Sequence, residues 1–92
     1  MKTRVTTTFK RVAKKLHQNQ IALLEKAIAA IQKEPDLGEL KVGDLAGVRV
    51  YKFHMLHQLI LLAYTYDEST DELILVSFGP HENFYANLKN IH

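Results

Sequence analysis

The chain has 92 residues, enough for one domain with a single hydrophobic core. It contains no cysteine, which excludes disulfides, thiolate zinc sites and thiol nucleophiles. The net charge is only +2, and the longest apolar run, residues 59–64, is far shorter than the ~20 residues of a membrane span. The N-terminus does not have the pattern of a secretory signal. We therefore expect one cytoplasmic domain over residues 1–92, with no membrane partner.

Two helices are predicted in the first third of the chain. The threonines at 6–8 offer N-cap side chains to a helix whose apolar residues, from Phe9 to Leu16, recur at i, i+3, i+4 and i+7. A second apolar stripe runs from Ile21 to Ile31, and Pro35 cannot continue that helix. Because only a few residues separate the two helices, we expect an antiparallel helical hairpin from about residue 8 to residue 34.

The rest of the chain is predicted to form a sheet. Residues 48–55 alternate between two faces, residues 59–66 are almost wholly apolar, and residues 73–78 return as a third strand ended by Gly79 and Pro80. Residues 3–5 are a candidate first strand, and residues 81–88 a short helix or turn. The predicted fold class is α+β, with a helical hairpin packed on a small twisted antiparallel β-sheet and a short C-terminal helix.

Charge is distributed unevenly along the chain. The first fifteen residues are strongly basic, whereas residues 67–72 are acidic. Such asymmetry steers a protein toward RNA along one face, although a solvated helix face is the alternative reading. The basic residues expected on the first helix are Lys10, Arg11, Lys14 and Lys15.

Histidines gather near the ends of the predicted strands. In a meander the direction reverses twice, so the C-terminal ends of the first and third strands lie at the same side of the sheet. His54 and His57 at the first strand can therefore approach His81, which follows the third. The sequence predicts a histidine cluster there, and ordinary surface histidines are the alternative.

This cluster suits the cleavage of RNA. Histidine, with a pKa of about 6.5, can act as an acid or a base near neutral pH. Lysine and arginine stabilise the charge on a phosphate, and Tyr85 can stack on an unpaired base. A metal site is not expected, because His54 and His57 lack the spacing of helical zinc ligands and no cysteine or carboxylate pair completes them. With no glycine-rich phosphate loop, no cofactor is expected.

The order of these segments resembles the RelE/ParE family of toxins. The resemblance spans nearly the whole chain: a helical hairpin, residues 45–52, an apolar strand ending in Tyr64, and the segment from Gly79 to Tyr85. It implies a type II toxin that is silenced by a cognate antitoxin. In the RelE branch the activity is metal-independent cleavage of messenger RNA on the ribosome, which inhibits translation. The ParE branch instead inhibits DNA gyrase without catalysis.

The resemblance also implies roles for individual residues. Lys52 falls where RelE-type toxins place a catalytic lysine, and His81 falls where members carry a histidine or arginine at the scissile phosphate. The strand at 59–66 lacks the arginine that RelE has there, so the histidines of the cluster are expected to substitute. The expected catalytic residues are His81, Lys52, His54, His57 and Tyr85, and the expected RNA-binding residues are Arg49, Lys10, Arg11, Lys14 and Lys15.

A ribosome-dependent endoribonuclease is accordingly the predicted function. Its expected partners are the antitoxin, the ribosome and messenger RNA. A non-catalytic inhibitor of gyrase is the alternative function.

Overall fold

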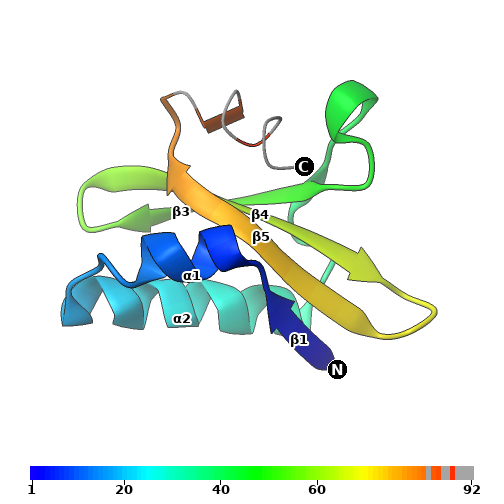
Figure 1. Ribbon diagram of the computed structural model, residues 1–92, viewed down its shortest axis with the longest axis horizontal. Coiled ribbons are helices and arrows are strands. Elements are labelled where there is room, and N and C mark those ends of the chain that lie inside the picture. Colours follow the sequence, from blue (N-terminus) through cyan, green and yellow to red (C-terminus); the bar gives the residue numbers. More distant parts are fainter. Residues whose placement is uncertain (83, 86–87, 89–92) are drawn as a thin grey trace.

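The computed structural model describes residues 1–82, 84–85 and 88, and it has an α+β fold (Figure 1). Two helices pack on a five-stranded sheet of order β1-β5-β4-β3-β2, which confirms the predicted fold class. In chain order the elements are β1 (Lys2–Val5), α1 (Thr7–Ala13), α2 (Gln18–Lys33), β2 (Glu39–Leu40), the 3-10 helix η1 (Gly43–Leu45), β3 (Arg49–Met55), β4 (Gln58–Asp67) and β5 (Glu72–Pro80).

The helical hairpin forms as the sequence predicted. The hydroxyl oxygen of Thr6 accepts a hydrogen bond from the Phe9 backbone N–H at 3.1 Å, and it caps α1 at the expected residue. In α2, Leu24 and Ile31 belong to a buried stripe that faces the sheet, and the helix ends two residues before Pro35. Both helices lie on the same side of the sheet, below it in the view of Figure 1.

β4 is the middle strand of the sheet. It pairs antiparallel with β3 on one side and with β5 on the other, as predicted for the apolar segment. The candidate first strand exists as β1, and it pairs parallel with β5, so the sheet is antiparallel except at this edge. The helical hairpin carries the chain from β1 across to the opposite edge of the sheet, where β2 pairs with β3.

Two details differ from the sequence prediction. β5 continues through Gly79 and Pro80, which pair with Leu61 and Ile60 of β4. A proline is tolerated there because its fixed φ is compatible with an extended backbone. The strand also ends at Pro80, so the missing N–H interrupts no further pairing. The two-residue strand β2 was not predicted, because two residues are too few to display an alternating pattern.

Each face of the sheet has its own apolar cluster. The face under the helices buries aromatic and large aliphatic residues, among them Phe9, Tyr64 and Phe78. The opposite face, which we call the second face, buries Val48, Val50, Leu61, Ala63 and Val76 against Phe84 and Leu88.

The described residues that follow β5 thus pack on the second face, through Phe84 and Leu88. Phe84, Tyr85 and Leu88 are helical, as predicted, whereas the rest of the expected helix beyond residue 82 lies outside the described residues. Within the described residues, no helix is both long and apolar enough to span a bilayer.

Candidate functional site

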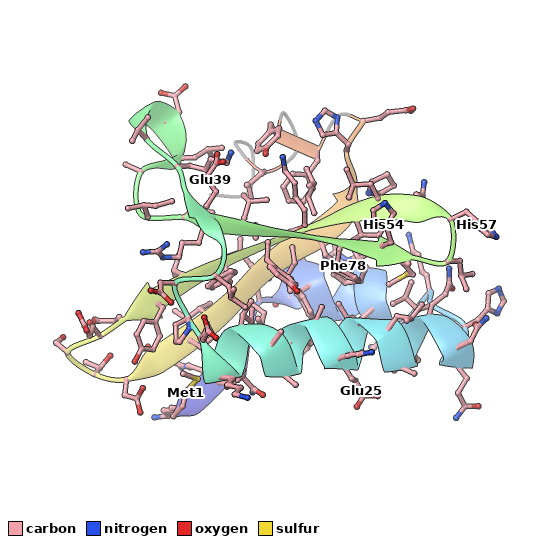
Figure 2. The ribbon with its side chains drawn as sticks, turned by 180° about the vertical axis from the view of Figure 1, so that it is seen from behind. Met1, Glu25, Glu39, His54, His57 and Phe78 are labelled. Atoms are coloured by element: carbon pink, nitrogen blue, oxygen red, sulfur yellow. The ribbon has the colours of Figure 1, made fainter. Side chains whose placement is uncertain are left out.

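β3 presents Lys52 and His54 on the second face. Strand residues alternate between faces, and Val48 and Val50 belong to the apolar cluster of that face, so Lys52 and His54 follow on the same side. Lys52 lies opposite Leu61 of β4, and both polar side chains are exposed. Figure 2 shows His54 on the side of the sheet away from α2. The apolar half of the strand is buried, and its polar end is open to solvent.

The end of β5 brings His81 to the same region. Because Pro80 pairs with Ile60, the chain leaves the sheet beside Leu59, the residue that pairs with His54. The backbone carbonyl of His81 accepts a hydrogen bond from Phe84 N–H at 3.3 Å, which closes the turn. The His81 ring lies 6.2 Å from the Tyr85 ring, centroid to centroid, nearly perpendicular at 86°. Tyr85 packs on the second-face cluster, so His81 is on the same face as Lys52 and His54.

β2 and the residue that follows it add two charged side chains that the sequence analysis did not select. Glu39 pairs with Val50 and therefore projects on the second face, as Figure 2 also shows. The Nζ of Lys41 forms an ion pair with the Glu39 carboxylate, and it lies 5.3 Å from the centroid of the Tyr85 ring. We call Glu39, Lys41, Lys52, His54, His81 and Tyr85 the second-face site.

Electrostatic coupling links these residues. The Lys41 ammonium lowers the pKa of Glu39 by hydrogen bonding and by its charge, and Lys52 contributes in the same direction. In return, the hydrogen bond to Glu39 raises the pKa of Lys41, and Tyr85 adds to this effect. The lowered pKa of Glu39 and the raised pKa of Lys41 both favour the charged forms, so this ion pair is maintained at neutral pH.

Two of the expected site residues lie elsewhere. His57 occupies the two-residue turn between β3 and β4, where it is exposed at the tip of the hairpin (Figure 2). Arg49 is on the helix side of β3, with Tyr51 and Phe53. Its guanidinium donates to the backbone carbonyls of Gly38 at 2.8 Å and Asp36 at 3.4 Å.

Arg49 lines a polar cavity of about 490 Å³ together with Pro35, Asp36, Tyr66 and Glu68. Two carboxylates share this cavity with the guanidinium, so its lining does not favour a phosphate. The structure thus separates Arg49 from the second-face site.

The basic residues of the first helix form another separate surface. α1 packs against β5 through Phe9, on the face opposite the second-face site. The four cations that surround this helix are all exposed to solvent: Lys10, Arg11, Lys14 and Lys15. Any RNA contact made by this surface lies on the other side of the sheet from Lys52 and His81.

The second-face site has the groups that RNA cleavage needs. It combines two imidazoles for proton transfer, two ammonium groups for a phosphate and one aromatic ring for stacking. Among the described residues, no group of three histidine, aspartate or glutamate side chains could hold a metal ion. The ring of Tyr85 contacts both Lys41 and His81.

Solved structures with the same fold include several bacterial toxins. A mutant of the Escherichia coli toxin RelE in the free state superimposes with a TM-score of 0.74 at 12% identity, over 98% of this chain and 90% of that chain. A chain of the Mycobacterium tuberculosis RelBE2 toxin–antitoxin complex gives a TM-score of 0.72 at 23% identity, over 87% and 96% of the two chains. The YoeB/ParE toxin of Agrobacterium tumefaciens gives 0.69 at 18% identity, over 88% and 99%. At these identities the likeness establishes the fold.

Sequence comparison establishes the family. No curated protein matches the chain closely enough to be counted as a relative. The family model of the ParE-like toxin of type II bacterial toxin–antitoxin systems, however, matches residues 3–89, nearly the whole chain. The resemblance to RelE/ParE toxins inferred from the residues is confirmed, and the chain belongs to the ParE-like toxins of type II bacterial toxin–antitoxin systems.

Proposed function

We propose that this toxin is a ribosome-dependent endoribonuclease that cleaves messenger RNA without a metal ion and so inhibits translation. The observation that carries the proposal is that Lys52, His54 and His81 are exposed on one face of the sheet, where the His81 ring contacts the Tyr85 ring. A protein that only blocks a partner by binding has no need of two imidazoles beside a lysine. These groups are, in contrast, the usual apparatus of acid–base catalysis at a phosphate.

In the proposed reaction, the ribose 2′-oxygen attacks the adjacent phosphorus and the bond to the 5′-oxygen breaks. A base takes the 2′-hydroxyl proton, and an acid gives a proton to the leaving oxygen. We assign these two transfers to His54 and His81, and the stabilisation of the phosphorane charge to Lys52. Tyr85 stacks on a base next to the cut, and His57 contacts RNA beside the hairpin tip.

The exposed cations of α1 suit a second, non-catalytic role. Their charge attracts ribosomal RNA without sequence preference, and this attraction orients the toxin on the ribosome. They lie on the opposite side of the sheet from His81, so the toxin would contact RNA on two sides.

An antitoxin is the expected partner in the resting state. Among the solved structures of the same fold are a RelBE toxin–antitoxin complex and a RelE mutant bound to a peptide of the antitoxin RelB. We propose that the cognate antitoxin of this chain covers the second-face site, because a free site would be toxic to the host. The contacts would follow an exposed strand edge or helix groove.

Inhibition of DNA gyrase is the second candidate function. It is favoured by the matching family model, whose description is ParE-like. In that case Lys52 and His81 would serve only as binding residues, and their removal would weaken an interface without affecting a chemical step.

One experiment separates the two functions. Primer extension on messenger RNA from cells that express the chain should reveal new 5′ ends within codons. In a supercoiling assay, the purified protein should leave the activity of gyrase unchanged. Growth arrest with intact messenger RNA and loss of supercoiling activity would instead establish the second candidate.

A further inference from the structure

We propose that Lys41 is a further RNA-phosphate-binding residue of the second-face site, and that Glu39 is an internal counter-ion which the RNA phosphate displaces. The inference rests on the proposed RNA-cleaving function, and it concerns how the empty site holds its charges. It arises from Glu39 of β2 and from Lys41, which follows that strand. Lys41 contacts the Tyr85 ring, and the charge of Lys52 acts on Glu39.

Lys41 is held in place more firmly than its ion-pair partner. Its side chain retains 21% of its exposure, whereas that of Glu39 retains 67%. The Lys41 backbone N–H donates to the carbonyl of Val48 at 2.9 Å, and its ammonium lies over the Tyr85 ring as a cation–π contact. If the carboxylate leaves, these contacts keep the ammonium at the site.

Glu39 is an anion among cations on a surface proposed to receive a polyanion. It is exposed, its carboxylate touches the Lys41 ammonium, and the charge of Lys52 also acts on it. A phosphate offers the same kind of charged oxygen acceptors to an ammonium group as a carboxylate does. An exposed ion pair contributes little, so the exchange of one anion for the other is inexpensive.

The position of Tyr85 indicates which phosphate Lys41 would bind. Its ring has Lys41 at 5.3 Å and the His81 ring at 6.2 Å. A nucleotide stacked on this ring would have one flanking phosphate near His81 and another within reach of Lys41. Lys41 therefore serves the phosphate next to the scissile one, which fixes the register of the strand.

The test is the affinity of the purified toxin for a single-stranded RNA oligonucleotide whose 2′-hydroxyls are methylated, so that it cannot be cut. The dissociation constant is measured at several salt concentrations for the natural chain and for Lys41→Gln, Lys41→Arg, Glu39→Gln and Lys33→Gln. Lys33, an exposed lysine in the last turn of α2, is the matched control because it lies outside the site. Thermal melting of each variant checks that the fold is retained.

We expect Lys41→Gln to weaken binding roughly 3–10-fold and to reduce the slope of log K against log salt by about 0.7, the value for one phosphate contact on a single strand. Lys41→Arg, which keeps the positive charge, should have the slope of the natural chain. A purely structural role of Lys41 would not make the slope depend on charge. Glu39→Gln should tighten binding several-fold, because the competing anion is gone. Lys33→Gln should leave both quantities unchanged.

Several results would overturn the inference. An unchanged salt slope in Lys41→Gln, or no binding of RNA by the natural chain, would remove Lys41 from RNA contact. Weaker or unchanged binding in Glu39→Gln would exclude the counter-ion role. A cleavage rate on ribosomes that falls about 100-fold in Glu39→Gln would assign Glu39 to proton transfer instead. These results are distinct from failure of the proposed function, which is shown by uncut messenger RNA with the natural chain.

Discussion

The two faces of the sheet are built from the same strands, but they differ in what they expose. On the helix side, α1 and α2 cover Leu62, Tyr64 and Phe78, and even the polar Arg49 is tied to backbone carbonyls. On the second face, Phe84 and Leu88 pack on the apolar cluster, whereas Lys52, His54 and His81 are exposed.

β3 displays this difference in five residues. Val50, Lys52 and His54 project on the second face, while Tyr51 and Phe53 stack with ring centroids 6.2 Å apart on the helix side. A change in a buried side chain of either face should thus affect stability, whereas a change in the exposed second-face site should affect chemistry.

A charge introduced at the buried centre of the sheet should abolish folding. Leu62 is fully buried at the centre of the sheet, and Leu62→Asp would leave an unpaired carboxylate there at a cost of several kcal/mol, comparable with the ~5–15 kcal/mol stability of a typical domain. Leu61→Asp should do the same from the second face, where Leu61 is also fully buried. The matched control is Lys52→Asp, an exposed neighbour that pairs with Leu61. Circular-dichroism melting measures the outcome, and cooperative melting of either leucine variant would contradict the strand assignment.

Reversing the basic charges around α1 should weaken ribosome binding while the second-face site remains intact. Changing Lys10, Arg11, Lys14 and Lys15 to glutamate removes four phosphate-attracting groups, so we expect roughly a 100-fold loss of affinity at low salt and a smaller loss at high salt. Sedimentation with ribosomes at two salt concentrations measures it. If the affinity loss were the same at both salts, a structural defect rather than electrostatics would explain it.

Removing one buried hydroxyl should cost about 1–3 kcal/mol of stability. The Tyr64 hydroxyl donates to the Pro35 carbonyl at 2.6 Å and accepts from the Gly38 N–H at 2.8 Å, which joins β4 to the loop after α2. Tyr64→Phe leaves both backbone groups without that partner. Urea unfolding measures the loss, and Tyr66→Phe is the control because the Tyr66 hydroxyl bonds to the exposed Asp71 carboxylate. Equal losses of unfolding free energy in Tyr64→Phe and Tyr66→Phe would show that burial of the hydroxyl does not determine the cost.

The folding stability at alkaline pH should also depend on the Tyr64 hydroxyl. Burial raises the pKa of Tyr64 above its usual value, so above pH ~10 the unfolded chain releases a proton that the folded chain retains. Folding stability from this group is complete below pH ~10 and falls as the pH rises toward the folded pKa. This loss of folding stability with rising pH should be smaller in Tyr64→Phe than in the natural chain. Identical profiles of stability against pH for these two proteins would contradict the prediction.

Local patterns in the sequence were sufficient for most of the fold. The 3.6-residue stripe of α2 and the alternation of β3 are set by burial on one side, so a window of a few residues reveals them. β2 was missed, because its existence depends on pairing of Glu39 with the distant Val50 and not on its own residues. The parallel pairing of β1 with β5 is a contact of the same long-range kind.

The site was predictable to the extent that it depends on strand direction. Strand reversal indicated that His54 and His81 lie at the same side of the sheet. In the structure His54 pairs with Leu59, and Pro80, which precedes His81, pairs with the adjacent Ile60. The alternation of residues 48–55 predicted Arg49 and Lys52 on opposite faces of the strand, and the structure agrees. The expected site nevertheless grouped the two residues by charge, and Arg49 lies outside the second-face site. Lys41 has no local signal, since only its contact with Tyr85 brings it to the site.

Whether the second face cleaves RNA is best decided by removing the His81 imidazole. The measurement is the rate of messenger RNA cleavage on programmed ribosomes by His81→Ala, beside the natural chain and the control His17→Ala. His17 is an exposed histidine that precedes α2 and lies outside the second-face site. If His81 transfers a proton, its removal should slow cleavage roughly 10²–10⁴-fold while ribosome binding and melting temperature stay unchanged. Cleavage at the natural rate by His81→Ala would contradict RNA cleavage by the second face.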